Sequence, residues 1–285
     1  MSEFVITLSS IPPRFAQIGA TLHDLLHQDV KVDQIRLNIA RSYRRYPGQV
    51  PSLPPLPEGI TVQYCDEDLG PATKLLPTLA DHRGRDTEIL FCDDDQIYPT
   101  DWARRFLEAR RDQPGCCIAG HGYDLQARPT GSGYNVDDGL RPRYFRAPKD
   151  LLYRLKRVGS LGLRKPYRVT RPGYVHILEG FRGAMVRPEF MPPEVFDLPE
   201  ILWTVDDPWF SGHLARNGVP IWRLVEPFMP PSKYAAHFID ALYDYSVQGV
   251  GRLDADTACI EYFRETYGIW QGEKETPQAA RIKSS

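Results

Sequence analysis

Three consecutive aspartates, Asp93 to Asp95, directly follow the apolar run 88–92. That run predicts a buried strand, and open α/β sheets bind their ligands beyond the carboxyl ends of the strands. Adjacent carboxylates repel one another unless a cation lies among them, and aspartate oxygens suit Mg²⁺ or Mn²⁺. Because side chains alternate along a strand, Asp93 and Asp95 can point to one side. The pattern favours a divalent-cation site, and the simpler alternative is a solvated acidic turn.

A lysine at the start of a predicted helix is the second feature. Lys74 closes the string Leu69-Gly-Pro-Ala-Thr-Lys74, whose proline opens a helix over 71–82. A lysine at this place could contact a phosphate, helped by the helix dipole. The string is not a P-loop, because the pattern GxxxxGK[ST] is absent. The alternative for Lys74 alone is an ordinary surface lysine.

A second acidic pair, Asp206 and Asp207, precedes Pro208. An aspartate cap at Asp207, proline at the first helical position and Asn217-Gly218 at the end together predict a helix. A cap needs one carboxylate, and this pair holds two. A carboxylate at such a place could act as general base toward an acceptor hydroxyl, and the two roles can coexist.

The elements that must position these groups alternate along the first 120 residues. We expect strands at 4–8, 34–39, 60–64, 88–92 and 116–119, and helices at 14–28, 71–82 and 101–111. This alternation is typical of a parallel α/β sheet. Regular order returns with strands at 175–178 and 219–224 and a final helix at 254–267. The expected divisions of the chain are 1–123, a loop-rich insertion over 124–175, a second half over 176–271, and a polar tail over 272–285.

The composition excludes several classes of protein. Hydrophobic residues are 42% and charged residues 25% of the chain, as in ordinary globular proteins. The net charge is −2, whereas nucleic-acid binders are usually basic. The sequence lacks the long apolar run of a membrane-spanning helix, and its N-terminus predicts a strand and not a signal peptide. Five cysteines without a CxxC spacing indicate reduced thiols, so we expect a cytoplasmic protein.

The middle of the chain is strongly basic. Residues 126–175 contain 12 Lys and Arg against 3 Asp, a local charge of +9 in a chain of net charge −2. Such a stretch could face an anionic substrate or an anionic membrane surface. The alternative is a solvated loop region.

The order of these motifs resembles the GT-A class of nucleotide-sugar glycosyltransferases, specifically its bacterial family-2-like branch. The resemblance rests on a first strand with Ser10-Ile-Pro-Pro-Arg14, a Thr73-Lys74-Leu75 helix, and the metal loop Phe91-Cys-Asp-Asp-Asp-Gln-Ile-Tyr-Pro99. It covers residues 4 to about 120 and returns over 179–222. It implies a GT-A type α/β fold: a Rossmann-like mixed sheet with helices on both faces and an acceptor-side subregion. Residues 1–123 would bind the nucleotide-sugar, and 176–271 would bind the acceptor and carry catalysis.

The resemblance also implies roles for individual residues. On the donor side these are Ser9 and Arg14 by the base or diphosphate, Asp66 or Asp68 near the nucleoside, Lys74 facing the nucleotide-sugar, and Asp93, with Asp94 beside it, toward the ribose. The implied metal ligands for Mn²⁺ or Mg²⁺ are Asp95, Asp93 and His237, for which a packed histidine is the alternative. Residues Glu179–Gly183 would form the loop beneath the donor sugar and the acceptor. In the pair Asp206-Asp207, the second member corresponds to the base of inverting enzymes.

We therefore expect a metal-dependent glycosyltransferase that uses a nucleotide-sugar, with a UDP-sugar favoured, and a glycan or lipid-linked acceptor. Surface polysaccharide or glycoconjugate synthesis is the expected setting, with peripheral contact at the inner membrane face through residues 126–175 and no nucleic-acid partner. One alternative is a non-catalytic sugar- or nucleotide-binding module. Another is a nucleotidyltransferase, which would carry a Gly-rich phosphate loop where this chain has Ser9–Arg14. A phosphatase with an aspartyl nucleophile would carry its acidic motif after the first strand.

Overall fold

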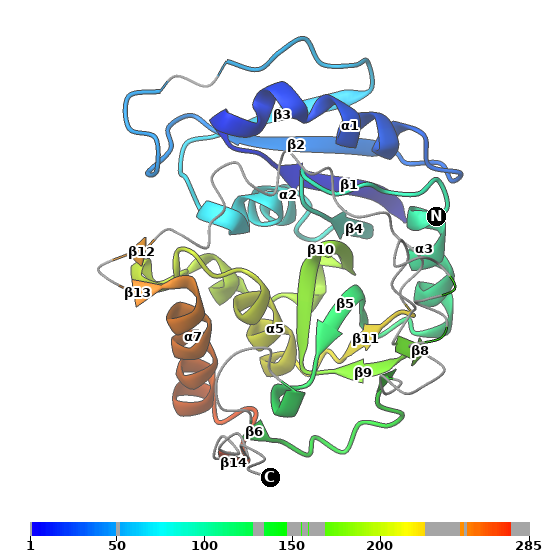
Figure 1. Cartoon of the computed structure of the whole chain (residues 1–285), viewed down its shortest axis with the longest axis vertical. Helices are drawn as coiled ribbons and strands as arrows, with labels where there is room; N and C mark the ends of the chain where they lie inside the picture. Colours follow the sequence, from blue (N-terminus) through cyan, green and yellow to red (C-terminus); the bar gives the residue numbers. More distant parts are fainter. Residues whose placement is uncertain are drawn as a thin grey trace.

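The structure is a computed structural model that describes residues 2–49, 52–127, 134–146, 169–225, 246–247 and 250–274, with the single residues 155 and 159. Its centre is an eight-stranded sheet in the order β3-β2-β1-β4-β10-β5-β11-β9 (Figure 1). These strands are β1 (Glu3–Ser9), β2 (Gln34–Ala40), β3 (Ile60–Cys65), β4 (Thr87–Phe91), β5 (Cys117–Tyr123), β9 (Gly173–Val175), β10 (Ile177–Val186) and β11 (Ile221–Arg223). Strands β10 and β9 run antiparallel to their neighbours, and the other neighbouring pairs are parallel.

The α-helices are α1 (Gly19–Leu26), α2 (Leu76–Asp81), α3 (Trp102–Asp112), α5 (Asp207–Arg216) and α7 (Arg252–Tyr267). Short 3₁₀-helices lie at Pro12–Gln17, Gly70–Lys74, Leu125–Ala127, Pro188–Phe190, Pro193–Phe196 and Glu200–Leu202. Two-stranded pairs are formed by β6 (Tyr134–Asn135) with β14 (Glu273–Lys274), β7 (Phe145–Arg146) with β8 (Val169–Arg171), and β12 (Ser246–Val247) with β13 (Val250–Gly251). None of the described helices is long and apolar enough to cross a membrane.

Successive side chains of the buried strands point to opposite faces of the sheet, and a layer of helices covers each face. On β4, Ile89 and Phe91 belong to the core with α2, α5 and α7, whereas Leu90 packs with α1 and α3 on the other face. The strand is buried on both faces, as its continuous apolar sequence requires. The predicted α/β fold class, a mixed sheet with helices on both faces, is confirmed.

Several predicted elements differ in extent from those in the structure. The predicted helices at 14–28 and 71–82 both begin as 3₁₀-helices at prolines, which lack the N–H of regular helix bonding. Strand β5 extends to Tyr123, four residues beyond the expected end, because β10 supplies a hydrogen-bonding partner there. A strand expected at 175–178 is the junction of β9 with the longer β10.

A bulge interrupts β10 at the centre of the sheet. Glu179 pairs with His121 and Ala184 pairs with Ala119, so residues 180–183 of β10 stand opposite the single residue Gly120. A Cβ at Gly120 would lie 2.5 Å from the Arg182 carbonyl oxygen, which explains why glycine stands there. Bulges of this kind aim side chains away from the regular ladder and are frequent beside active sites.

The predicted divisions of the chain stay predictions, and segments 1–123 and 176–271 both contribute strands to the one central sheet. Much of the basic stretch 126–175, and His237 with its surroundings, lie outside the described residues.

Candidate active site

The chain changes direction across the sheet between β1 and β4. From β1 it moves outward to β2 and β3, and it then returns to place β4 on the other side of β1. The carboxyl ends of β1 and β4 are therefore adjacent, at the kind of switch point where open α/β sheets bind ligands. Ser9 ends β1, and Asp93 to Asp95 follow β4, so the first set of predicted groups meets here.

Arg14 joins the segment after β1 to two of the three aspartates. Its Nη1 lies 3.0 Å from Asp94 Oδ1 and 3.4 Å from Asp95 Oδ2. Asp94 also accepts a hydrogen bond from the hydroxyl of Ser10, the neighbour of the predicted Ser9. Burial raises the pKa of Asp94 to about 6, although Arg14 and Ser10 oppose that change.

Two buried hydroxyls hold the backbone of this acidic loop. Thr21 Oγ1, on α1, donates to the carbonyl oxygens of Asp94 at 2.8 Å and Gln96 at 3.1 Å. Tyr98 Oη donates to the Asp93 carbonyl oxygen at 2.9 Å and accepts from the Asp93 N–H at 3.1 Å. Burial raises the pKa of Tyr98 well above its ordinary value, so it stays a neutral phenol. Tyr98 thus positions the loop and does not act as a base.

Lys74 is a buried cation between two acidic elements. Its Nζ lies 2.6 Å from Asp93 Oδ1 and 2.6 Å from Asp206 Oδ2, and 5.9 Å from the centre of the Phe91 ring. Burial alone lowers the pKa of Lys74, but the carboxylates of Asp206, Asp93 and Asp207 outweigh it and raise that pKa well above its ordinary value. Only 6% of the side chain is exposed, so Lys74 is not a surface lysine.

Asp93 and Asp95 form their ion pairs with different cations. Asp93 lies against Lys74, whereas Asp95 shares Arg14 with Asp94. Strand β4 ends at Phe91, so the alternation of side chains no longer applies to the turn that follows.

Helix α5 brings the second acidic pair to the same place. Asp206 precedes the helix and is 1% exposed. Asp207, which was expected to be the cap, is the first helical residue, and Asp206 takes the cap position without a side-chain capping hydrogen bond. The reason is that the Asp206 carboxylate is engaged with Lys74.

A glycine allows these groups to approach one another. The Gly180 amide donates to Asp207 Oδ1 at 2.8 Å. A Cβ at Gly180 would lie 2.9 Å from Lys74 Nζ, 3.0 Å from Phe91 Cε2 and 3.2 Å from Asp207 Oδ1. Tyr98 Oη, under the acidic loop, also lies 3.3 Å from the carbonyl oxygen of the next residue, Phe181. The bulge of β10 therefore forms one wall of the site, where the loop Glu179–Gly183 was expected.

One polar pair beside the site was not predicted from the sequence. His121 Nδ1 and Glu179 Oε2 are in hydrogen-bond contact between directly opposed positions of β5 and β10. About a quarter of each side chain is exposed, 27% and 24%. His121 alternates with Cys117 and Ala119, so it lies on the face of the sheet that α5 covers. That alternation was the available signal, but the predicted strand ended at Ala119.

Asp66 and Asp68 organise the loops after β2 and β3. Asp68 accepts hydrogen bonds from the amides of Arg44 at 2.8 Å and Gly70 at 2.9 Å, and burial raises its pKa. Asp66 is exposed and its Oδ1 lies 3.0 Å from Arg41 Nε. Their place near a nucleoside stays a prediction.

The charge and the donor chemistry of the site fit a divalent cation. Its five aspartates, Asp93 to Asp95 with Asp206 and Asp207, outnumber the two cations Arg14 and Lys74 by three charges. Carboxylate oxygens are the donors that Mg²⁺ and Mn²⁺ prefer. Within the described part of the chain, no group of three or more His, Cys, Asp and Glu side chains is arranged to hold a metal ion. The predicted ligand His237 lies outside that part.

Comparison with known proteins gives distant likenesses among solved structures. No family model matches the chain, and no curated protein matches it. Solved structures of S. aureus TarS are similar: TarS 1-349 has a TM-score of 0.41 at 10% identity, covering 93% of this chain and 72% of that one. Its complex with UDP-GlcNAc has a TM-score of 0.43 at 11% identity, covering 94% and 73%. Because these scores are low, the fold class and the chemistry rest on the sheet and the site themselves.

Proposed function

We propose that this chain is a glycosyltransferase that moves a sugar from a nucleotide-sugar to an acceptor hydroxyl. The observation that carries the proposal is the position of Lys74, which joins the acidic loop after β4 to the acidic pair at α5. A donor-binding group and a proton acceptor thus meet at the switch point of the sheet. The resemblance of the sequence to GT-A glycosyltransferases supports the same reaction class and favours a UDP-sugar.

On the donor side, the acidic loop and its two cations would receive the nucleotide diphosphate. Arg14 and Lys74 are the cations that would face its oxygens, and Tyr98 and Thr21 keep the loop backbone fixed before the ligand arrives. A divalent ion held by Asp95 and Asp93 would neutralise the charge that develops on the departing diphosphate. Metal dependence stays a prediction.

On the acceptor side, Asp207 would take the proton of the attacking hydroxyl. The acceptor oxygen bonds to the anomeric carbon while the bond from that carbon to the diphosphate oxygen breaks, and its electron pair leaves with the diphosphate. The Gly180 amide fixes one oxygen of the Asp207 carboxylate. Asp206 would act through Lys74 by fixing its ammonium group. We place the His121–Glu179 pair on the acceptor side. Its strands β5 and β10 lie beyond β4 from β1, whereas the Lys74 carbonyl oxygen accepts a hydrogen bond from Thr7 of β1. Inversion at the anomeric carbon follows from a single displacement.

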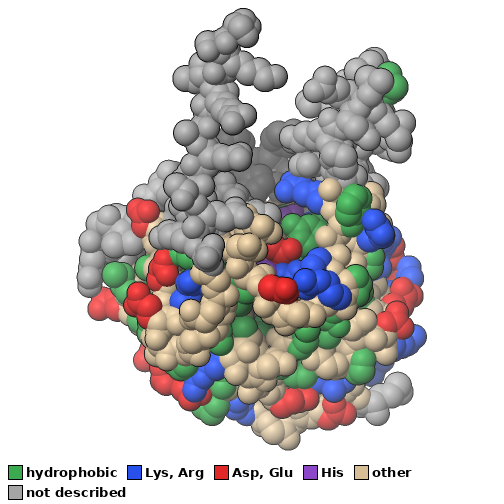
Figure 2. All heavy atoms as spheres, turned by 90° about the horizontal axis from the view of Figure 1, so that it is seen from below, with side chains coloured by type: hydrophobic (Ala, Val, Ile, Leu, Met, Phe, Trp, Pro, Cys, Tyr) green, Lys and Arg blue, Asp and Glu red, His purple; other side chains and the backbone are tan. Residues whose placement is uncertain are grey.

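The proposals for the acceptor and for the biological setting are those of the sequence analysis. We propose a glycan or lipid-linked acceptor in surface polysaccharide or glycoconjugate synthesis, at the inner face of the membrane. The basic stretch 126–175 would make that contact. Its described residues include acidic partners, since Asp138 and Asp137 pair with Arg143 and Arg141. Figure 2 shows acidic and basic side chains side by side on the face seen there.

A thermal-shift panel of nucleoside diphosphates and nucleotide-sugars, each with and without Mn²⁺, tests the donor site. A ligand at 100 times its dissociation constant stabilises by about 2.7 kcal/mol, so a shift is readily seen. We expect one nucleotide to raise the melting temperature. Turnover of the matching nucleotide-sugar should release the corresponding nucleoside diphosphate. Asp95→Ala should lower turnover on the order of 10²–10³-fold while the protein stays folded. The exposed Asp112→Asn is the matched control.

The outcomes separate the alternatives. Binding of a nucleotide-sugar without any turnover would favour a non-catalytic binding module. Release of pyrophosphate from a nucleoside triphosphate would favour a nucleotidyltransferase. If Asp95→Ala turns over the donor as fast as the unmodified protein, the assignment of the acidic loop is wrong.

A further inference from the structure

A polar cavity lies at the edge of the sheet opposite to the proposed site. Its volume is about 510 Å³, and its lining includes Glu3, Gln34 and Thr61, which stand at or next to the first residues of β1, β2 and β3. These strands are parallel, so the cavity lies at their amino ends, whereas the acidic loop follows the carboxyl end of β4. The seven residues of β1 separate the two places by about 20 Å.

Two of the lining side chains are buried and held by their neighbours. Arg36 is 6% exposed, pairs with Asp81 and donates from Nε to Asn38 Oδ1 at 3.1 Å. His82 is 4% exposed, and its Nδ1 lies 3.2 Å from Thr87 Oγ1. Burial lowers the pKa of His82, so its ring is uncharged at neutral pH. These fixed groups give the cavity a preformed polar wall.

Other lining groups are open to a ligand. Within the described part of the chain, the side chains of Arg85, Gln34 and Thr61 make no hydrogen bond or ion pair. The Glu3 carboxylate lies 3.5 Å from the uncharged ring of His82. The cavity therefore presents donors from a guanidinium and an amide, and an acceptor carboxylate that faces an uncharged neighbour.

The lining excludes several kinds of ligand. It contains no apolar side chain, so an apolar ligand would gain little there by burial. Its formal charge is −1, from the carboxylates of Glu3, Asp33 and Asp81 and the guanidiniums of Arg36 and Arg85, which disfavours phosphates and other anions. Asp33 and Asp81 already pair with a lysine and an arginine, so a cationic ligand would find only one carboxylate without a cation.

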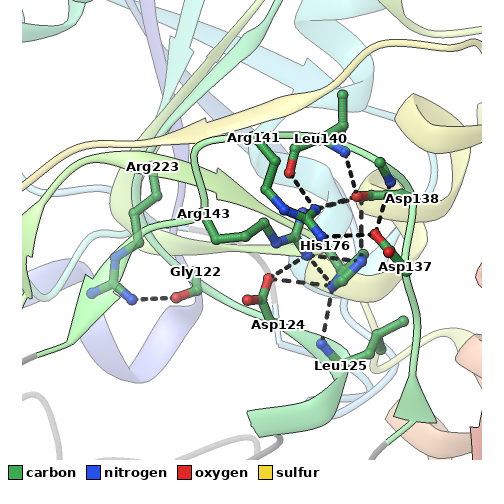
Figure 3. A network of polar contacts seen from close by, with 11 residues as sticks. Gly122, Asp124, Leu125, Asp137, Asp138, Leu140, Arg141, Arg143, His176 and Arg223 are labelled. Carbon is green, nitrogen blue, oxygen red and sulfur yellow. Dashed lines mark hydrogen bonds and ion pairs between the residues drawn. The ribbon is translucent and has the colours of Figure 1, made fainter.

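A second group of charged side chains outside the proposed site lies at the carboxyl end of β5, and its charges balance. Asp124 and Asp138 lie 2.7 Å and 3.1 Å from Arg143, and Figure 3 shows the ring of His176, 3% exposed, among them. Arg223 of β11, itself 3% exposed, brings a second guanidinium. Two carboxylates and two guanidiniums leave no surplus charge, so this network stabilises the fold, and the open cavity is the better candidate for a ligand.

We propose that the cavity binds an uncharged sugar unit. A sugar hydroxyl both donates and accepts hydrogen bonds, so one ring can accept from Arg85 and Gln34 while it donates to Glu3. It does so without adding a charge, and the volume lies within the range of small-molecule pockets. The site is separate from the proposed transfer site, and the proposal does not rest on the transfer reaction.

Saturation-transfer difference NMR with the methyl glycosides of glucose, galactose, mannose and N-acetylglucosamine tests the cavity. We expect at least one of these glycosides to bind the unmodified chain, and neither methyl glucuronide, an anion, nor putrescine, a cation, to bind. Arg85→Ala and Glu3→Ala should each raise the dissociation constant of the glycoside at least about tenfold, the usual contribution of a hydrogen bond to a charged group. Arg111→Ala, at an exposed arginine of α3, is the matched control.

The Asp95→Ala protein locates the bound sugar, because its substitution lies in the proposed transfer site. It should bind the glycoside as tightly as the unmodified chain does, whether or not it turns over a donor. Undiminished binding in both Arg85→Ala and Glu3→Ala would overturn the proposal, and loss of binding in Asp95→Ala would then place the sugar at the transfer site. The proposal would also be wrong if none of the glycosides bound, or if glucuronide or putrescine bound in their place.

Discussion

Lys74 Nζ and Asp206 Oδ2 lie 2.6 Å apart, with side chains that are 6% and 2% exposed. One residue ends the 3₁₀-helix before α2 and the other precedes α5, so the contact joins the first part of the chain to its last third. A cation buried at this place is held by the two acidic elements on either side of it. The geometry of the proposed site therefore depends on this one ammonium group.

Replacing Lys74 should destabilise the protein as well as stop turnover. Lys74→Met leaves Asp93 and Asp206 without their buried cation, and breaking a buried ion pair costs about 3–5 kcal/mol. Urea unfolding measures the loss. Lys31→Met, at a lysine that is 87% exposed, should change the free energy of unfolding by no more than about 0.5 kcal/mol. A Lys74→Met protein as stable as the Lys31→Met protein would contradict the buried pair.

If Asp207 is the general base, its replacement should slow turnover without weakening donor binding. Asp207→Asn keeps an oxygen that can accept the Gly180 amide, but it removes the basic carboxylate. We expect kcat to fall by about 10²–10⁴-fold, the usual contribution of general base catalysis, with little change in the donor dissociation constant. Steady-state turnover and calorimetric titration of the nucleotide measure the two quantities. The exposed Asp197→Asn serves as control, and an equal loss in both variants would count against a base at Asp207.

A substitution at Gly180 tests whether the bulge of β10 lines the proposed site. A methyl group at Gly180 meets Lys74 Nζ at 2.9 Å, so Gly180→Ala should displace the ammonium group from Asp93 and Asp206 and lower turnover at least about tenfold. Overpacking should cost about 1–3 kcal/mol of stability. Gly115→Ala, where a Cβ meets nothing within 4 Å, should match the unmodified protein in both respects. Full activity of Gly180→Ala would show that the bulge does not line the reacting groups.

The sequence predicted the acidic loop because that loop depends on a short local pattern. The switch point was not predicted, because it depends on the order of the strands in the sheet. A buried apolar strand followed by Asp93 to Asp95 indicates a site without knowledge of the rest of the chain. The burial of Lys74 was not predictable, because its partner Asp206 comes from a distant element. The same contact removed Asp206 from helix capping and so shifted the predicted cap by one residue. The partnership of His121 with Glu179 depends on the register of β5 with β10, which local patterns do not determine.

His213 should make stability depend on pH. Its ring is fully buried between Trp209 and Phe263, and neither ring nitrogen has a hydrogen-bond partner in the described structure. Burial lowers the pKa of His213 to about 4, with Arg216 acting in the same direction. Between pH 4 and about 6.5 the unfolded chain binds the proton and the folded chain does not, so stability falls as pH falls through this window.

Urea unfolding at pH 7.5 and pH 5.0 measures that dependence. Burial of His213 should lower the free energy of unfolding by about 2 kcal/mol between pH 7.5 and pH 5.0. His213→Leu should remove this part of the pH dependence. His27→Gln, at an exposed histidine, should keep the pH dependence of the unmodified protein. The same pH dependence in His213→Leu and in the unmodified protein would mean that the buried ring does not resist protonation.

Strand β10 lies between β4 and β5, although it follows both of them in the chain. During synthesis, β4 and β5 are made before β10. Their edges that face β10 stay unpaired until residues 177–186 have been made. Two apolar strand edges are exposed over that interval, and exposed edges invite association with other chains. The sheet is completed only when β10 inserts between β4 and β5. This step is slow, because pairing strands that are distant in the sequence carries a cost in loop-closure entropy. Nascent chains are therefore most exposed to aggregation just before β10 is complete.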